Sequence, residues 1–380
     1  MKTFALLLLL ALRGLAIDAT ETARFLGGLS VDNTSLANFA KVPAWREHAT
    51  QLDAAWTQSE LRQLVKVRAW AATSLGSTYS AATPVFYFFS GPDVLYPLAF
   101  YPDAGTYVLC AKEPVGEVAD PSQMPPEDLP AALAGLRKAL TSLLNYSFFI
   151  TQDLRSDIKQ KHFTGILPVL EILLVRSGAQ LVEITPAACD KNGAITLGAV
   201  ARGGTPGVRI RFKRKEAREQ TLYYFSGDLS NGGLTAHAGL LRFCERLGRG
   251  RALLKAASYL PHESDFSRIR DWLLGHSASI LQDPSGIPFA HFTNANWRLN
   301  VWGNHAAPIN LFAKYTQPAL AEALAKPRPP LPFGFGYQTQ PPKAVLIFAE
   351  RQATAENDAA PEGGLRPPPP AAAPKEPGNN

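Results

Sequence analysis

Two short aromatic segments each end in a turn that carries an aspartate. Residues 86–89 read Phe-Tyr-Phe-Phe and are followed by Ser-Gly-Pro-Asp, which ends at Asp93. Residues 222–225 read Leu-Tyr-Tyr-Phe and are followed by Ser-Gly-Asp, which ends at Asp228. Ligands of open α/β sheets bind beyond the carboxyl ends of the strands. If the two strands are parallel neighbours, both aspartates reach the same edge of the sheet.

Two carboxylates at one edge suit acid–base catalysis or metal binding, because neighbouring carboxylates split their pKa values. Asp93 and Asp228 are therefore candidate catalytic residues of a hydrolase, with His237 as the candidate histidine. Asp103 and His262 could join them. The alternative is structural, because Ser-Gly-Pro-Asp is also a common turn sequence in which the aspartate binds its own backbone.

Complete catalytic and cofactor motifs are missing from the sequence. The glycine-rich loop 227–233 lacks the lysine of a phosphate-binding P-loop. Residues 303–305 (Gly-Asn-His) match only a fragment of the metallophosphoesterase pattern. No Gly-x-Ser-x-Gly nucleophile elbow occurs, and no two histidines have the spacing of a helical zinc site. We therefore predict no cofactor, and a divalent metal only under the hydrolase interpretation.

Four basic residues alternate with apolar ones in a predicted strand. Successive side chains of a strand point to opposite sides, so the four cations would share one face. They are Arg209, Arg211, Lys213 and Lys215. Such a strip could bind an anionic envelope polymer or a membrane surface. The other interpretation is a charged edge strand that resists pairing with a second sheet. No aromatic side chains are interleaved for base stacking, so we expect no specific nucleic-acid binding.

The composition is that of a globular protein with a basic excess. Of the 380 residues, 46% are hydrophobic and 18% are charged, and the net charge is +6. A positive charge favours anionic surfaces, and it also keeps a protein soluble. Cys110, Cys189 and Cys244 allow one disulfide in three alternative pairings, or none. Without a Cys-x-x-Cys motif, neither thiol–disulfide exchange nor structural zinc is expected.

The two ends of the chain differ from its body. Lys2 precedes nine apolar residues at 4–12 and small residues up to Ala19, which is the pattern of a secretory signal peptide. The apolar run is too short to span a bilayer, and no cysteine follows the cleavage region to carry a lipid anchor. Residues 352–380 are rich in proline and alanine and are expected to be disordered. We predict a signal peptide at 1–19, a globular body at 20–351 and export to the periplasm or the outside.

Helical and strand patterns alternate throughout the body. We predict an α/β fold with a mixed or mostly parallel sheet flanked by helices. No shift in composition marks a domain boundary, and the Pro/Gly-rich segment 185–207 is the best candidate for one. Helical patterns occupy 45–75, 130–149, 266–277 and 315–326. Strand patterns occupy 86–89, 106–110, 180–185, 195–200, 208–212, 221–225 and 344–349.

Three stretches resemble a set of uncharacterised exported bacterial proteins. They are Tyr-Phe-Phe-Ser-Gly-Pro-Asp at 87–93, Leu-Lys-Ala-Ala-Ser-Tyr-Leu at 254–260 and Ile-Leu-Gln-Asp-Pro-Ser-Gly-Ile-Pro at 280–288. The resemblance covers most of the body but not the tail. It implies bacterial export and supplies no activity and no catalytic residues. The sequence thus favours a soluble binding or structural component of the cell envelope, with a hydrolase as the alternative.

Overall fold

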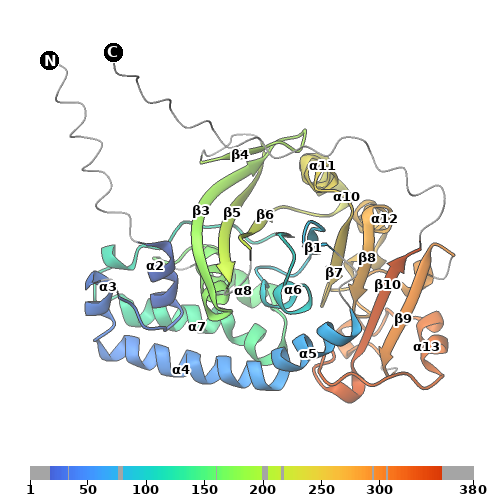
Figure 1. Cartoon of the computed structure of the whole chain (residues 1–380), viewed down its shortest axis with the longest axis horizontal. Helices are drawn as coiled ribbons and strands as arrows, with labels where there is room; N and C mark the ends of the chain where they lie inside the picture. Colours follow the sequence, from blue (N-terminus) through green and yellow to red (C-terminus); the bar gives the residue numbers. More distant parts are fainter. Residues whose placement is uncertain are drawn as a thin grey trace, which may run out of the picture.

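The computed structural model describes residues 18–32, 34–75, 80–159, 161–198, 204–214, 218–292, 295–304 and 307–352. The predicted tail from residue 353, most of the predicted signal peptide and Lys215 lie outside these ranges. Within them, a ten-stranded sheet runs through the molecule in the order β4-β3-β5-β6-β2-β1-β7-β8-β10-β9 (Figure 1). The strands are β1 (Val85–Phe88), β2 (Thr106–Ala111), β3 (Ala179–Cys189), β4 (Ile195–Leu197), β5 (Thr205–Arg214), β6 (Gln220–Ser226), β7 (Gly250–Leu254), β8 (Ser277–Gln282), β9 (Trp297–Gly303) and β10 (Val345–Arg351).

The sheet is mixed, which confirms the predicted fold class. Its five central strands β6, β2, β1, β7 and β8 are parallel to one another. Strands β5, β3 and β4 continue one side in antiparallel fashion, and β10 and β9 do so on the other. Numbered along the chain, the five parallel strands have the order 3-2-1-4-5, which is the order of a Rossmann-type sheet. The strand order therefore reverses between β1 and β7.

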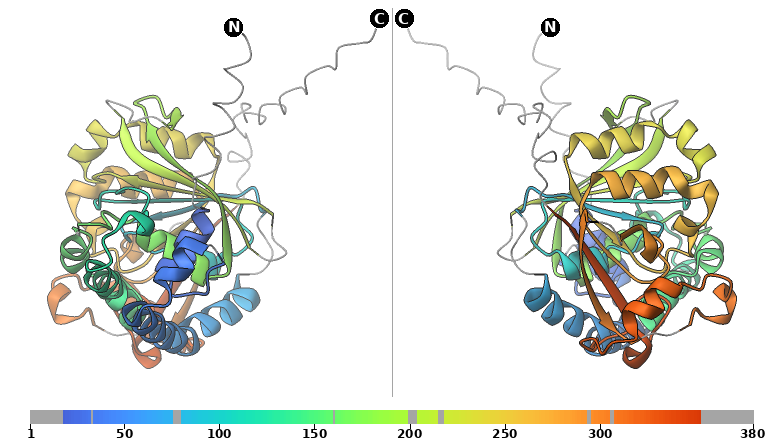
Figure 2. Two further views of the ribbon diagram at one scale, coloured as in Figure 1. Left: turned by 90° about the vertical axis from the view of Figure 1, so that its left-hand side faces the viewer. Right: turned by 90° about the vertical axis from the view of Figure 1, so that its right-hand side faces the viewer.

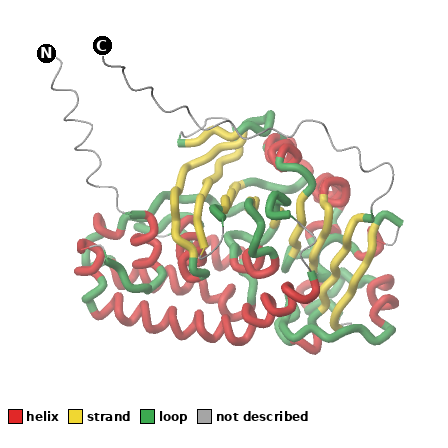
Figure 3. The backbone as a smooth tube through the Cα atoms, viewed as in Figure 1, coloured by secondary structure: helices red, strands yellow, loops and turns green. Residues whose placement is uncertain are grey.

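Helices cover both faces of the sheet (Figures 2 and 3). One face carries α2 (Ala19–Leu26), α3 (Thr34–Phe39), α4 (Pro43–Ser59), α5 (Val65–Ser74), α6 (Leu95–Phe100), α7 (Leu129–Tyr146), α8 (Thr151–Asp157) and α9 (Leu167–Arg176). The other face carries α10 (Asn231–Ala236), α11 (Gly239–Arg246) and α12 (Ser267–His276), while α13 (Pro318–Leu324) packs beside β9 and β10. Short helical turns are η1 (Glu60–Leu64), η2 (Pro121–Gln123), η3 (Leu260–His262), η4 (Ser264–Phe266), η5 (Phe289–Phe292), η6 (Asn310–Phe312) and η7 (Pro341–Lys343).

Strand β1 shows why its sequence is apolar throughout. Val85 and Tyr87 belong to the core under the first helical layer, whereas Phe86 and Phe88 belong to the core under α11 and α12. All four side chains are fully buried, because a central parallel strand is covered on both sides. The segment 185–207 is predicted as the best place for a domain boundary. Its described residues, 185–198 and 204–207, belong to β3, β4, the start of β5 and the adjoining turns, and β3 pairs with both β4 and β5.

Helix α9 contains a carboxyl group inside the apolar core. Every residue from Leu167 to Val175 is buried, including Glu171. Neither carboxyl oxygen of Glu171 has a hydrogen-bond partner among the described residues. Burial raises the pKa of Glu171 to about 8, so the group holds a proton at neutral pH.

We predict that Glu171→Gln removes a pH dependence of stability. The pKa of the carboxyl rises from 4.5 to about 8 on folding, so its stability contribution is complete below pH 4.5 and is lost as the pH rises towards 8. Urea unfolding should show the wild type losing up to ~1.4 kcal/mol per pH unit relative to the variant across this window. Glu127→Gln, at an exposed position, is the control. Parallel pH curves for wild type and Glu171→Gln would contradict the prediction.

Candidate functional site

A cavity of about 500 Å³ lies at the carboxyl end of the parallel strands. Its inner lining comes from the residues that directly follow β1, β2 and β7, and its outer lining comes from two loops and Tyr337. The lining residues are Phe89, Ser90, Gly91, Asp93, Glu113, Phe148, Phe149, Ile150, Thr151, Gln152, Lys255, Ala256, Ser258, Ile309, Leu311, Phe312 and Tyr337. The cavity thus occupies the point where the strand order reverses, which is where open α/β sheets bind their ligands.

Two opposite charges are buried at the inner end of the cavity. Lys255 Nζ lies 3.0 Å from Asp93 Oδ2, and both side chains are 1% exposed. The hydroxyl of Tyr87 donates to the same carboxylate oxygen at 2.8 Å. Lys255 also donates to the carbonyl of Ser147 and lies 3.9 Å from the ring centroid of Tyr96. Burial lowers the pKa of Lys255, and the negative charge of Asp93 opposes that shift.

The backbone is strained around this cavity. Within the described residues, the non-glycine residues with positive φ are Phe89 (69°), Ser147 (67°), Ala256 (51°), Ser258 (54°) and Tyr259 (54°). Three of them line the cavity, the carbonyl of Ser147 binds Lys255, and Tyr259 follows Ser258 directly. Such conformations cost free energy and persist where surrounding contacts impose them, so the backbone around this cavity is held in place by its surroundings.

The strained turn after β7 is held through its backbone N–H groups. Asp283 Oδ1, just beyond β8, accepts from Ala256 N at 2.9 Å. The next N–H donates to Ser285 Oγ at 2.8 Å. Burial raises the pKa of Asp283, and hydrogen bonds that it accepts from Ser285 and from Ala256 N, together with the charge of Lys255, oppose the shift. The two side chains therefore position the turn from the neighbouring strand.

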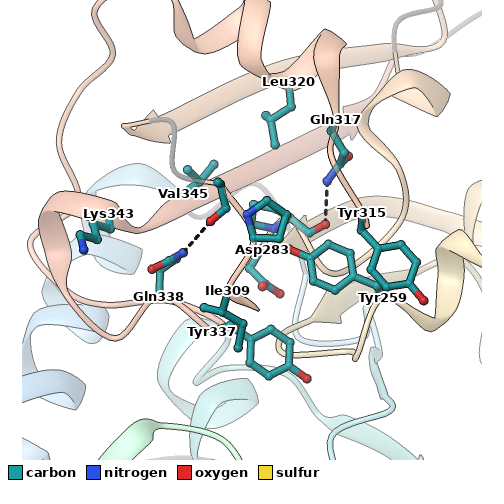
Figure 4. A pocket seen from close by; sticks show the side chains of 13 residues that line it. Tyr259, Asp283, Ile309, Tyr315, Gln317, Leu320, Tyr337, Gln338, Lys343 and Val345 are labelled. Atoms are coloured by element: carbon teal, nitrogen blue, oxygen red, sulfur yellow. Dashed lines mark hydrogen bonds between the residues drawn. The ribbon is translucent and has the colours of Figure 1, made fainter. Parts of the chain in front are cut away.

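Tyr337 holds the same turn from a distant loop. Its hydroxyl accepts from Ser258 N at 3.1 Å and donates to the carbonyl of Ala256 at 3.0 Å. Figure 4 shows Tyr337, Asp283 and Tyr259 around a second, smaller cavity. Tyr337 also lines the main cavity and so forms part of the wall between the two.

Glu113 lines the main cavity and carries a buried, unpaired carboxylate oxygen. The side chain follows β2, is 2% exposed and lines the cavity. Its Oε2 atom has no hydrogen-bond partner among the described residues. A Cβ atom added to Gly91, which has φ +62°, would lie 4.0 Å from this oxygen, so the turn after β1 comes close to it. Burial raises the pKa of Glu113, and Arg155 opposes the shift.

Neither Glu113 nor Lys255 was identified as a site residue from the sequence. A signal for Glu113 was present: an acidic residue follows a strand about 20 residues after a glycine that follows the preceding strand, as in dinucleotide-binding sheets. Lys255 carries a weaker signal, a charge directly after an apolar strand.

The predicted catalytic residues Asp93 and Asp228 follow two strands that are not neighbours. β2 lies between β1 and β6, so the strands preceding Asp93 and Asp228 are parallel but not adjacent. Asp228 Oδ2 lies 3.0 Å from Lys112 Nζ, and its Oδ1 accepts from Ser230 N at 2.9 Å, as the turn interpretation expected. A cavity of about 100 Å³ beside the main one is lined by the neighbours of Asp228 but not by Asp228 itself.

The predicted histidines lie apart from the Asp93–Lys255 pair. His237 Nδ1 lies 2.9 Å from Thr205 Oγ1, and its ring is near Gly227, beside Asp228. His262 packs against the ring of Tyr259 at 5.0 Å, and burial lowers its pKa to about 4. Asp103 precedes β2 and therefore lies towards the opposite edge of the sheet.

The arginines of the basic strip are paired with glutamates. Arg209 Nη2 lies 2.9 Å from Glu183 Oε1, and Arg211 lies 2.7 Å from Glu183 Oε2 and 2.5 Å from Glu219 Oε1. Hydrogen bonds from Thr185 and Arg211 lower the pKa of Glu183 to about 2. Lys213 is exposed. β5 lies between β3 and β6, so the alternative interpretation as an edge strand is wrong.

The described part of the chain contains neither a disulfide between the three cysteines nor a cluster of metal ligands. Cys110, Cys189 and Cys244 are buried free thiols, and burial raises the pKa of Cys189 to about 11. These ranges contain no group of three or more His, Cys, Asp or Glu side chains arranged to hold a metal ion. They also contain no helix that is long and apolar enough to cross a membrane.

Compared with known proteins, the chain matches no protein-family model and no curated protein.

We predict that the buried pair Asp93–Lys255 and the exposed pair Asp228–Lys112 respond differently to loss of the lysine. Lys255→Met leaves a carboxylate unpaired in the interior, so the free energy of unfolding should fall by about 3–5 kcal/mol. Lys112→Met should cost less than about 1 kcal/mol, because its pair is solvent-exposed. Urea unfolding measures both.

A double variant serves as the control for this comparison. Asp93→Asn combined with Lys255→Met removes both charges and should recover part of the stability that Lys255→Met loses. Equal losses in Lys255→Met and Lys112→Met would show that the buried pair has no special role.

Proposed function

We propose that the protein binds a nucleoside-containing small molecule in the cavity between the carboxyl ends of β1 and β7. The observation that carries the proposal is Glu113, which lines this cavity and whose buried Oε2 atom has no hydrogen-bond partner among the described residues. An unpaired buried carboxylate oxygen is costly, and a ligand that donates hydrogen bonds to it relieves that cost.

The position of Glu113 supports ribose as the donor. In Rossmann-type sheets an acidic side chain after the second strand accepts hydrogen bonds from the ribose hydroxyls, about 20 residues after the glycine turn of the first strand. Here Gly91 follows β1 and Glu113 follows β2. The strand order supports ribose only by analogy, whereas the burial of Glu113 and its place in the cavity lining are properties of this chain.

Aromatic side chains in the cavity support a flat ring as the second part of the ligand. Phe89, Phe148, Phe149, Phe312 and Tyr337 all contribute to the lining. Aromatic faces stack on nucleobases with little regard to base identity. A nucleoside joins the two required groups, a diol and a flat ring, in one molecule.

The two functions expected from the sequence have less support. A hydrolase centred on Asp93 and Asp228 needs free carboxylates, whereas each of the two is paired with a lysine. Binding of an anionic envelope polymer or membrane surface along β5 needs unpaired cations, whereas Arg209 and Arg211 are paired with glutamates. The leader pattern and the resemblance to exported bacterial proteins support the additional proposal that the protein is exported.

We predict that adenosine binds and that Glu113→Gln weakens its binding about 10- to 100-fold, since a hydrogen bond to a charged group contributes ~1.5–3 kcal/mol. Isothermal titration calorimetry on the full chain measures the affinity. Glu117→Gln, an exposed change of the same kind four positions on, should leave it unchanged. In addition, 2′,3′-dideoxyadenosine should bind wild type and Glu113→Gln alike. Equal affinities of wild type for adenosine and its dideoxy analogue would refute the role of Glu113.

We also predict that adenosine binds more weakly at lower pH. Burial raises the pKa of Glu113, so protonation begins at a higher pH than for an ordinary glutamate. Adenosine affinity of the wild type should therefore fall as the pH decreases through this raised pKa, because the protonated carboxyl is a poorer acceptor. Glu113→Gln should show no such decrease. Tighter binding at acidic pH would contradict the assignment.

A further inference from the structure

We infer that the ligand is a nucleoside without phosphate groups whose outer end carries an apolar substituent, and not a nucleotide or dinucleotide. This inference rests on the proposed function and adds the chemical class of the ligand. It departs from what the Rossmann-type strand order alone would suggest, because that arrangement usually binds dinucleotides. Three features of the cavity lead to it.

The first feature is a protein carboxylate in the place of the pyrophosphate. In dinucleotide-binding sheets the pyrophosphate lies at the N-terminus of the helix that follows the first strand. Here that helix is α6, and Asp93 Oδ1 accepts a hydrogen bond from Tyr96 N in its first turn at 3.4 Å. The place is therefore already occupied by a negative charge, which would repel a phosphate.

The second feature is the charge of the lining. Its charged side chains are Asp93, Glu113 and Lys255. The ammonium group of Lys255 is already bound by Asp93, the carbonyl of Ser147 and the ring of Tyr96. Arg155 on α8 is exposed and does not line the cavity, although its positive charge lowers the pKa of Glu113. The described lining thus offers a phosphate no free cation, whereas its excess negative charge tolerates a neutral or cationic ligand.

The third feature is an apolar rim. Ile150 and Leu311 line the cavity from two different loops and are 38% and 79% exposed. Phe148, Phe149 and Phe312 adjoin them in the lining. The buried charged groups thus lie at the inner end of the cavity, whereas its exposed lining combines Ile150 and Leu311 with the polar Thr151 and Gln152. A ligand with its ribose on Glu113 would bury this rim if its outer end were an alkyl or aryl group.

The test compares four ligands on the full chain by isothermal titration calorimetry: adenosine, 5′-hexylthioadenosine, AMP and NAD. We expect 5′-hexylthioadenosine to bind at least about tenfold more tightly than adenosine, because several methylene groups leave water. AMP and NAD should bind at least about tenfold more weakly than adenosine, because of like-charge repulsion.

Two variants locate the apolar part of the ligand. Leu311→Asn should reduce the advantage of 5′-hexylthioadenosine over adenosine, measured as the ratio of the two affinities within the variant. Leu61→Asn, which changes a leucine of similar exposure (68%) outside the cavity, should alter neither affinity.

The outcomes separate this inference from the proposed function. If AMP or NAD binds as tightly as adenosine, or if the hexylthio group adds no affinity, the inference is overturned while nucleoside binding stands. If none of the four ligands binds, the proposed function is overturned and the inference falls with it.

Discussion

The buried ion pair between Asp93 and Lys255 is the interaction on which the site depends. It ties the turn after β1 to the end of β7 and, through the carbonyl of Ser147, to the end of α7. Two charges in the interior are stable only when further polar contacts replace the lost water, and here Tyr87 and Tyr96 provide them. A pair of this kind adds little net stability, but it tolerates few alternative arrangements. It therefore fixes three chain segments in the one geometry that leaves a cavity between them.

Local sequence was sufficient to predict the fold class, because each element carries its own pattern. The aromatic run at 86–89 and the leucine spacing at 130–149 predict a strand and an amphipathic helix without any tertiary information, and the structure has β1 and α7 there. Strand order was not predictable in this way. The insertion of β2 between β1 and β6, and of β10 between β8 and β9, depends on pairings between residues far apart in the chain. The periodicity of apolar residues in the sequence does not indicate which distant strands pair.

The site was only partly predictable for a related reason. Asp93 stood out because its turn has a recognisable sequence, but the residue that neutralises it is over 160 positions away in the chain. Glu183 and Glu219 likewise neutralise the arginines of β5, and nothing adjacent to those arginines in the sequence indicates it. Glu113 has a sequence signal in its spacing from Gly91, but it also follows an apolar strand like many exposed glutamates, and its burial beside Gly91 is visible only in the structure. Sequence patterns locate charges well, but the tertiary structure decides which of them remain available.

The internal position of β10 has a consequence for the order in which the protein matures. β9 pairs with β10, and β10 pairs with β8, so β9 joins the sheet only after the strand that follows it in the chain. Tyr337, which holds the turn after β7, also belongs to the connection between β9 and β10. A ribosome delivers these segments last. The emerging chain therefore carries an unfinished edge and an open site until almost all of its body has been synthesised.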